Sequence, residues 1–357
     1  MTDRRSPDPG CATPLTPERC APLTPEQALH LLDALTWAPA AGPDRWERAA
    51  DHVAARVGDL LRPAPAHCRA AAERMLPALD RTSLYRAKYD LMLLLHPDDW
   101  FTFMNMGHQP AAAGAVAQPA APGPQPGGAD QGRYAARLYD LVVGGAEAPA
   151  DGAAADGAAA GGALAGAVVL DVGSGRGGGT ERLTRVHGAR SATGLDLSPA
   201  SVAFCRRVHR GLGLGFEQGR AEDLPFAAGS FDAVVSVESA HCFADPDAFF
   251  AEARRVLRPG GRLLFADEWP ADQVDRLAAR VTAAGLHLVV QEDITDGVLR
   301  ALDLLPAQVA RLLAALPADA GRQAYTRFFG DRVGRDSAGL YRSGRFRYLR
   351  LAAVRGK

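Results

Sequence analysis

The sequence has no apolar run of the roughly 18 residues that a membrane-spanning helix requires. It also has no excess of charge of one sign, because 40 lysines and arginines balance 41 aspartates and glutamates. Nucleic-acid binding depends mainly on Lys and Arg contacts to phosphate, so this balance argues against a nucleic-acid partner. The amino-terminal residues are charged without a following apolar stretch, which argues against a secretory signal. We therefore expect a cytoplasmic protein without a membrane span.

Cysteine is scarce, and the five that occur lie far apart. None forms a CxxC pair, and their odd number argues against a disulfide framework. His96 and His108 have no metal-ligand partner at a useful spacing. We therefore expect reduced thiols and no metal site.

The composition changes along the chain and divides it into six segments. They are a disordered tail (1–22), a helical amino-terminal region with a lid (23–109), an Ala/Gly/Pro linker (110–130), a leading helix (131–143), an Ala/Gly linker (144–166) and a carboxy-terminal domain (167–357). The helical region is predicted from Thr24, Pro25 and Gln27, a capping residue, a first-turn proline and a capping-box glutamine. The linkers have too little side chain to offset their ordering entropy, so we expect mobile loops.

From Ala167 onward, short apolar strands alternate with amphipathic helices, a pattern typical of a parallel α/β sheet. A late strand is predicted at 285–290, followed by two helices at 294–304 and 307–316. Residues 346–354 alternate apolar and basic side chains and predict a closing antiparallel strand. The arginines around this strand are most simply a solvated face. They are Arg342, Arg345, Arg347 and Arg350.

A glycine-rich segment, GSGRGGGT at 173–180, follows the first predicted strand directly. Glycines there permit a tight turn and let a ligand approach where a Cβ would clash. Because Gly173, Gly175 and Gly178 also fit the dinucleotide pattern G-x-G-x-x-G, a dinucleotide site stays open, as does a turn without a ligand.

Asp196 ends the second predicted strand, and Ser198 and Pro199 then cap a helix. A carboxylate at this position can accept both hydroxyls of a ribose. Dehydrogenases and methyltransferases share the feature, so it favours a nucleoside ligand without choosing between them. A merely solvated strand-end aspartate is the alternative.

Further motifs follow in order: LPFAAGSFDAV at 224–234 and LRPGGRL at 257–263. With the glycine-rich segment and GLDLSP at 194–199, the chain resembles class I S-adenosylmethionine-dependent methyltransferases over roughly residues 168–357. This resemblance implies a Rossmann-like sheet, mostly parallel with the last strand antiparallel, and S-adenosyl-L-methionine as cofactor. A nicotinamide dehydrogenase would not be expected to have the last two motifs.

The resemblance implies a cofactor site made of Asp171, Gly173, Ser174, Gly175, Asp196, Leu197, Ala221, Glu222 and Glu238. In such sites the glycine loop holds the methionine end, Asp196 takes the ribose hydroxyls, and Leu197 packs on the adenine. Relatives usually have Asp where Arg220 stands, and arginine cannot accept a hydrogen bond. Either Glu222 or a backbone carbonyl substitutes, or the affinity for the cofactor falls.

Three shorter passages are similar to phthiotriolone/phenolphthiotriolone dimycocerosate methyltransferases and related polyketide O-methyltransferases. They are FMNMG at 103–107, VESAHCF at 237–243, and LYRSGR at 340–345 with Arg347 and Tyr348, which corresponds to a strand in those relatives. This resemblance implies O-methylation of a hydroxyl on a polyketide-like, lipid-like or aromatic small molecule. C- or N-methylation, a nicotinamide oxidoreductase and an inactive cofactor-binding partner are the alternatives. A homo-oligomer is compatible with the sequence.

Methyl transfer to an alcohol or phenol benefits from a general base, and His241 is the leading candidate. Asp267 could orient this base or bind the acceptor hydroxyl. Glu238 is expected to cap the loop or contact the cofactor rather than to act as a base. Phe103 and Asn105 belong to the predicted lid, whose aromatic residues would form an apolar wall for the acceptor. His241 could instead only pack against the cofactor or orient its loop, Asp267 could be a satisfied strand-end acid, and the aromatic residues could be plain helical core.

Overall fold

The computed structural model describes residues 86, 89, 90, 93, 102–111, 132–144, 163–211, 213–315 and 337–357. The chain forms two compact units, Met1–Ala78 and Leu79–Lys357, and every described residue lies in the second unit. The predicted tail (1–22), the amino-terminal helices and most of both linkers lie outside the described residues. No helix in the described part of the chain has the length and apolar character that crossing a membrane requires.

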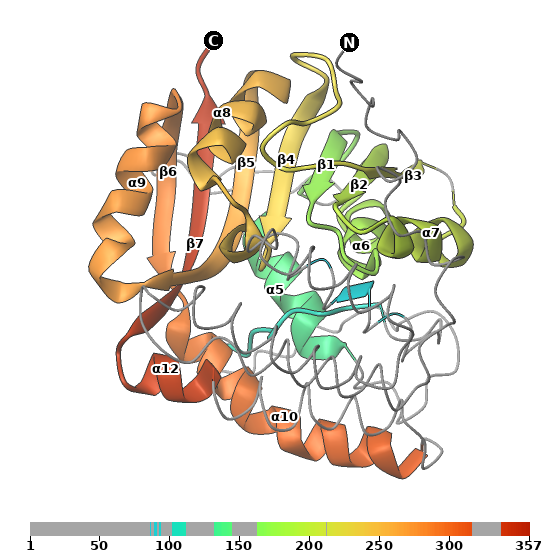
Figure 1. Ribbon diagram of the computed structural model, residues 1–357, viewed down its shortest axis with the longest axis vertical. Coiled ribbons are helices and arrows are strands. Elements are labelled where there is room, and N and C mark those ends of the chain that lie inside the picture. The colour runs from blue at the N-terminus through green and yellow to red at the C-terminus, as the bar shows by residue number, and fades with distance from the viewer. Residues whose placement is uncertain are drawn as a thin grey trace, which may run out of the picture. The chain divides into compact units, whose positions relative to one another are not determined.

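A seven-stranded sheet forms the centre of this unit (Figure 1). Its strands are β1 (Val168–Val172), β2 (Ser191–Asp196), β3 (Leu214–Gln218), β4 (Phe231–Val237), β5 (Leu257–Pro270), β6 (Leu286–Asp293) and β7 (Phe346–Arg355). The order is β3-β2-β1-β4-β5-β7-β6. Strands β1 to β5 pair in parallel, whereas β7 is antiparallel to both β5 and β6. The predicted, mostly parallel α/β sheet with an antiparallel last strand is confirmed.

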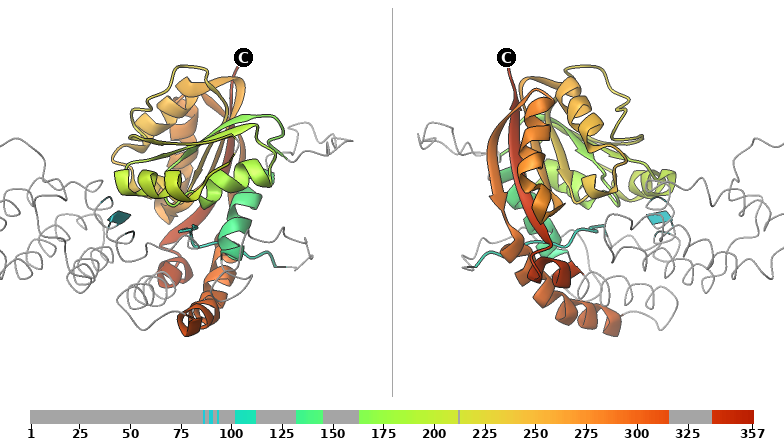
Figure 2. Two further views of the ribbon diagram at one scale, coloured as in Figure 1. Left: turned by 90° about the vertical axis from the view of Figure 1, so that its right-hand side faces the viewer. Right: turned by 60° about the vertical axis from the view of Figure 1, so that its left-hand side comes forward.

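Helices cover both faces of the sheet (Figure 2). They are α5 (Arg133–Gly144), α6 (Gly178–Arg185), α7 (Pro199–Val208), α8 (Pro246–Val256), α9 (Val274–Ala283), α10 (Thr295–Ala315) and α12 (Ala338–Arg342), with short 3-10 turns η4 (Ala240–Cys242) and η5 (Ala271–Gln273). Helices α8 and α9 lie on one face, and α5 lies on the other. Helices α10 and α12 lie beyond the carboxyl ends of the parallel strands.

Local chemistry determines where these helices begin. Ser198 accepts a hydrogen bond from the Ser201 amide at the start of α7, and Asp245 caps α8 in the same way. Both helices have proline in their first turn, where the missing N–H costs nothing. The strand ends before α7 and α8 are therefore fixed at the edge of the sheet.

An aromatic row fills the core between the sheet and helix α8. Phe243, Phe249, Phe250 and Phe265 follow one another with ring centroids 5.0–5.8 Å apart. Three of these rings, all except Phe243, have no exposed surface. Full burial of one such ring is worth about 1.5–3 kcal/mol. This core packs helix α8 against strand β5.

Two predictions about the carboxy-terminal third are wrong. The two helices expected at 294–304 and 307–316 form one helix, α10, which contains Pro306. Proline removes a single helical hydrogen bond, and the buried residues Val298, Leu302 and Val309 hold both halves of the helix in place. Residues 340–345, expected in a strand, instead end α12 and form a turn at Gly344, whose φ is +73°.

Arg350 also differs from its prediction as part of a solvated face. Its side chain is only 5% exposed, and Nη1 donates a hydrogen bond to Glu292 at 2.6 Å. Strand β7 lies inside the sheet between β5 and β6, and its six central residues, 348–353, are buried on both faces. An alternating pattern alone cannot reveal that position.

Candidate functional site

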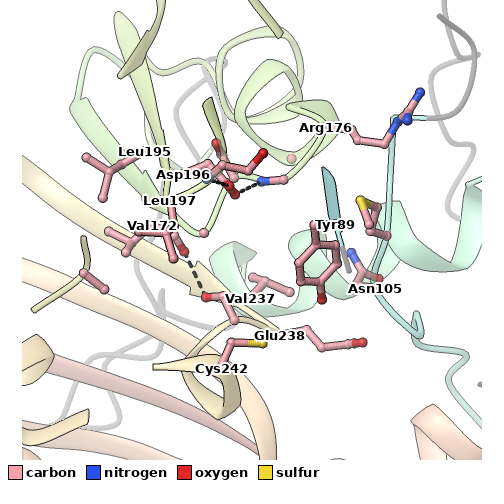
Figure 3. A pocket seen from close by; sticks show the side chains of 18 of the residues that line it. Tyr89, Asn105, Val172, Arg176, Leu195, Asp196, Leu197, Val237, Glu238 and Cys242 are labelled. Atoms are coloured by element: carbon pink, nitrogen blue, oxygen red, sulfur yellow. Dashed lines mark hydrogen bonds between the residues drawn. The ribbon is translucent and has the colours of Figure 1, made fainter. Parts of the chain in front are cut away.

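A cleft that is partly open to solvent lies at the carboxyl ends of β1, β2 and β4. The glycine-rich loop, the ends of β2 and β4, the loop after β3, α5 and residues 102–105 all contribute to its walls (Figure 3). It brings together ten of the predicted site residues: Phe103, Asn105, Gly173, Ser174, Gly175, Asp196, Leu197, Ala221, Glu222 and Glu238. Asp171, His241 and Asp267 are not among its lining residues.

The glycine-rich loop needs glycine for two different reasons. Gly173 has φ +77°, and a Cβ there would lie 2.3 Å from the Cβ of Ser239. Gly179 lies against α5, and a Cβ there would lie 2.0 Å from the Tyr139 ring. The loop is thus pressed between the β4 loop and α5, which leaves its backbone as the floor of the cleft.

Asp196 holds the glycine loop with one carboxylate oxygen and the start of α7 with the other. Oδ2 accepts the Gly175 amide at 2.8 Å, and Oδ1 accepts the Ser198 amide at 2.9 Å. Burial raises the pKa of this carboxyl to about 6. Each oxygen can still accept a further hydrogen bond. The geometry therefore suits a ligand with two adjacent hydroxyls, such as a ribose.

Asp171 lies beneath the loop rather than in the cleft, and it is fully buried. Thr180 donates its hydroxyl to Oδ2 at 2.7 Å, and Tyr139 donates to Oδ1 at 3.4 Å. Burial raises the pKa of this carboxyl to about 7. Asp171 thus joins β1, α6 and α5, and it would act on a ligand through the loop that it supports.

His241 and Asp267 form a pair beside the cleft. The Asp267 side chain is fully buried and accepts His241 Nδ1 at 2.8 Å and the His241 backbone amide at 3.1 Å. Burial opposes a charge on the imidazole, but neighbouring Cys242 and Asp267 outweigh it and raise the pKa of His241 well above its usual value. Cys242, the next residue, does line the cleft.

Glu238 connects the cleft to two distant segments. Its Oε2 accepts the backbone amide of Met106 and the hydroxyl of Tyr348, both at 2.8 Å. Burial raises the pKa of this carboxyl to about 8. Glu238 therefore ties residues 102–111 to strand β7.

Glu222 and Arg220 lie at the β3 side of the cleft. Glu222 Oε1 accepts the Ala244 amide at 2.8 Å, and Oε2 lies 3.6 Å from the Arg220 guanidinium. Glu222 thus holds the loop before α8 and pairs with the residue that stands where the relatives usually have Asp.

Sequence reasoning missed several residues that line the cleft, among them Tyr139, Arg176, Ser239, Cys242 and Phe243, whereas Tyr89 belongs to the predicted aromatic cluster. Tyr139 could have been found as one of the apolar positions of the amphipathic segment at 134–143. Arg176 is 1% exposed and stacks on Phe204 at 4.0 Å. Its place inside the glycine-rich loop was the available signal.

Within the described ranges, no cluster of three or more His, Cys, Asp or Glu side chains could hold a metal ion.

Comparisons with known proteins agree with this geometry. The family model described as "Methyltransferase domain" matches residues 170–265. The chain is 38% identical over 180 residues to phthiotriol/phenolphthiotriol dimycocerosates methyltransferase 1 of Mycobacterium ulcerans (strain Agy99), covering 50% of this chain and 65% of the relative. It is 42% identical over 155 residues to a fatty-acid O-methyltransferase of Mycolicibacterium smegmatis (strain ATCC 700084 / mc(2)155), covering 42% and 57%. The matches thus span less than two thirds of these relatives.

Two solved structures share the fold. The 4+2 cyclase SpnF aligns with a TM-score of 0.54 at 23% identity, covering 76% of this chain and 95% of the cyclase. Geranyl diphosphate C-methyltransferase from Streptomyces coelicolor A3(2), solved with S-adenosyl-L-homocysteine, aligns with a TM-score of 0.52 at 20% identity, covering 78% and 99%.

The cleft and its glycine-rich loop fit S-adenosylmethionine, the cofactor of these methyltransferases. Gly173 leaves no room for a side chain of its own, and Asp196 offers two free acceptor positions to a ribose. The strand order, the glycine-rich loop, Asp196 and the family match lead to one identification: the chain contains a class I S-adenosylmethionine-dependent methyltransferase domain.

Proposed function

We propose that this protein transfers a methyl group from S-adenosylmethionine to a hydroxyl of a polyketide-like, lipid-like or aromatic small molecule. The observation that carries the proposal is the His241–Asp267 pair, which adjoins the cleft through its lining residue Cys242. The names of the similar mycobacterial proteins, a phthiotriol dimycocerosates and a fatty-acid methyltransferase, support an acceptor with a long apolar part.

S-adenosylmethionine supplies an electrophilic methyl group, and the chain must align an acceptor with it. Asp196 would hold the ribose hydroxyls, Gly173 and Gly175 would line the methionine end, and Leu197 and Ala221 would flank the adenine. His241 would accept the proton of the acceptor hydroxyl through Nε2, because Asp267 holds Nδ1. Asp267 would also stabilise the imidazolium that forms, and the burial of this pair would strengthen the interaction.

Apolar side chains make up much of the cleft wall. Phe103 packs edge-on against Tyr139 at 6.1 Å, and Met104, Val237 and Phe243 line the same cleft. Trp100 and Phe101 of the predicted aromatic wall lie outside the described residues. A wall of this kind favours an apolar acceptor over a sugar.

The test is methyl transfer from methyl-labelled S-adenosylmethionine to a panel of long-chain fatty acids, long-chain alcohols, phenols and amines. We expect labelled ether or ester products and titration-calorimetry binding of S-adenosylhomocysteine but not of NADH. Products labelled on carbon or nitrogen would establish the alternative chemistries. Cofactor binding with no labelled product from any acceptor would favour an inactive binding partner, and NADH binding would favour an oxidoreductase.

The proposed base has its own test. We expect His241→Ala to slow turnover roughly 100-fold or more, while the dissociation constant of S-adenosylhomocysteine stays nearly unchanged. His287→Ala is a matched control, because His287 lies on β6 away from the cleft. Turnover that barely changes in His241→Ala would place the base elsewhere.

A further inference from the structure

Glu238 has a backbone conformation that its residue type disfavours. Among the residues that the structure describes, it is the only non-glycine residue with positive φ, at 53°. Residues held in this way persist where the surrounding structure fixes them, and they gather at functional sites. Here the fixing contact is the Glu238 amide, which donates to the Ala266 carbonyl at 2.8 Å. The strained backbone turns the side chain into the cleft (Figure 3).

The two oxygens of the Glu238 carboxyl have different surroundings. Both hydrogen bonds that the described residues donate to this group end on Oε2, one from the Met106 amide and one from the Tyr348 hydroxyl. Of the two oxygens of a neutral carboxylic acid, the carbonyl oxygen is the one suited to accept two hydrogen bonds. In the neutral form the proton therefore resides on Oε1. The residue stays partly accessible and lines the cleft, so Oε1 is the atom available to a ligand.

The strand order shows which ligand Oε1 would meet. Asp196 ends β2, Glu238 follows β4, and β1 lies between these strands. Adjacent strands are ~4.8 Å apart, so the two carboxyl groups project from positions about 10 Å apart. A ribose at Asp196 thus leaves the β4 end of the cleft for the reactive methyl and the acceptor. His241, three residues after Glu238, marks the same end.

We propose that Glu238 is a specificity-determining residue that acts as a neutral acid and donates an Oε1–H hydrogen bond to a second oxygen of the acceptor, near the methylated hydroxyl. The acceptor class is then an apolar chain with a hydroxyl and a neighbouring carbonyl oxygen. This inference rests on the proposed methyltransferase function. A carboxylic acid held neutral in an apolar site is an effective hydrogen-bond donor. The raised pKa of Glu238, about 8, agrees with this protonation state at neutral pH.

The experiment compares two probes that differ by one oxygen, 4-hydroxytetradecan-2-one and tetradecan-4-ol. Their dissociation constants are measured by titration calorimetry on the full chain saturated with S-adenosylhomocysteine. The wild-type protein should bind the hydroxyketone at least about tenfold more tightly than the alcohol, the value of one good hydrogen bond. Equal affinities, or no binding of the hydroxyketone, would overturn the proposal.

Substitutions of Glu238 distinguish a role as hydrogen-bond donor to the acceptor from a purely structural role. In Glu238→Gln the amide oxygen can accept from Met106 and Tyr348 while the amide nitrogen donates into the cleft, so the tenfold preference should remain. In Glu238→Ala the preference should fall to about one. Glu268→Gln is the matched control, because Glu268 accepts from Tyr341 without lining the cleft. A Gln variant that behaves like the Ala variant would contradict the donor role.

The preference of the wild-type protein for the hydroxyketone over the alcohol should decline above about pH 8. The preference of Glu238→Gln should not change with pH. The other titratable groups of the described residues around Glu238 are Tyr89, His108, Tyr139, His241, Cys242, Asp267, Tyr341 and Tyr348. Burial raises the pKa values of Tyr139, Tyr341 and Tyr348 well above the usual range, so these phenols stay neutral at pH 8. His241 is present in both proteins, so a decline that occurs only in the wild-type protein is assigned to Glu238. A parallel decline in both would therefore refute the assignment to Glu238.

Failure of this proposal is distinguishable from failure of the proposed function. If the wild-type protein does not bind S-adenosylhomocysteine, the methyltransferase function fails. If it binds this ligand and transfers methyl groups but shows no preference between the two probes, only the role of Glu238 fails.

Discussion

Asp196 has both of its oxygens bound to amides and still offers each of them to a ligand. Removing the carboxylate would leave the ribose hydroxyls without their acceptor and the Gly175 amide without its partner. We expect Asp196→Ala to weaken S-adenosylhomocysteine binding by about 1–3 kcal/mol, measured by titration calorimetry. The exposed Asp272→Ala serves as control. Unchanged affinity would remove Asp196 from the site.

The His241–Asp267 pair predicts a pH dependence. A general base works when deprotonated, and Asp267 is one of the groups that raise the pKa of His241 well above its usual value. The rate should therefore rise with pH through this raised pKa. In Asp267→Asn the pKa should fall, and the rising limb of the kcat profile should move to lower pH. A limb that does not move would show that His241 is not the titrating base.

Glu238 should also make stability depend on pH. Its pKa is about 8 in the folded protein and 4.5 in a free side chain, so the folded state binds more protons between these values. The free energy of unfolding should therefore fall as pH rises from 4.5 to 8, by at most about 1.4 kcal/mol per unit. Relative to wild type, Glu238→Gln should gain stability over this window, as measured by urea unfolding. A pH-independent difference would contradict the raised pKa.

For single residues, the sequence predicted the place in the fold better than it predicted burial and side-chain contacts. The order of motifs placed Gly173, Asp196 and Glu238 at strand ends, and strand ends of a parallel sheet meet at one edge. It could not show that Asp171 points beneath the loop or that Arg350 is buried, because both depend on contacts with elements distant in sequence.

At the scale of elements, the contact between α5 and the glycine loop is tight enough to test. Gly179→Ala would force its methyl group against the Tyr139 ring, which overpacks this contact. We expect a loss of about 1–3 kcal/mol in stability and weaker S-adenosylhomocysteine binding. Gly339→Ala, in α12 with open space around it, should be neutral or stabilising by up to about 1 kcal/mol. Equal effects of the two variants would contradict the tight contact.

Most elements of the carboxy-terminal domain could be predicted because capping residues and apolar periodicity mark them locally. The caps Ser198 and Asp245 show where α7 and α8 begin. Two helices were predicted in place of α10 because Pro306 locally signals a helix break. The helix continues because its buried residues pack against distant parts of the chain, which the local sequence does not show. Residues 340–345 were assigned to a strand on the resemblance to relatives rather than on a local signal, and the structure places them at the end of α12 and in the turn at Gly344.

For the whole molecule, ligand binding should stabilise the unit that contains the cleft. A ligand at 100 times its dissociation constant adds about 2.7 kcal/mol to the free energy of unfolding. S-adenosylhomocysteine should therefore raise the melting temperature of this unit by roughly 5–10 °C, because each kcal/mol shifts it by about 2–4 °C. NADH at the same concentration should leave it unchanged, as followed by calorimetry. A shift with NADH instead would favour a dinucleotide site.

The position of β7 has a consequence for how the molecule assembles. Strand β6 is joined to the rest of the sheet only through β7, which follows it by more than fifty residues and enters between β5 and β6. Until β7 arrives, two strands present unpaired backbone edges, and closing such a long loop is slow. A newly synthesised chain would therefore pass through an aggregation-prone intermediate, in which a strand of another chain could pair with the exposed edges of β5 and β6. Insertion of β7 would complete the sheet and prevent this pairing.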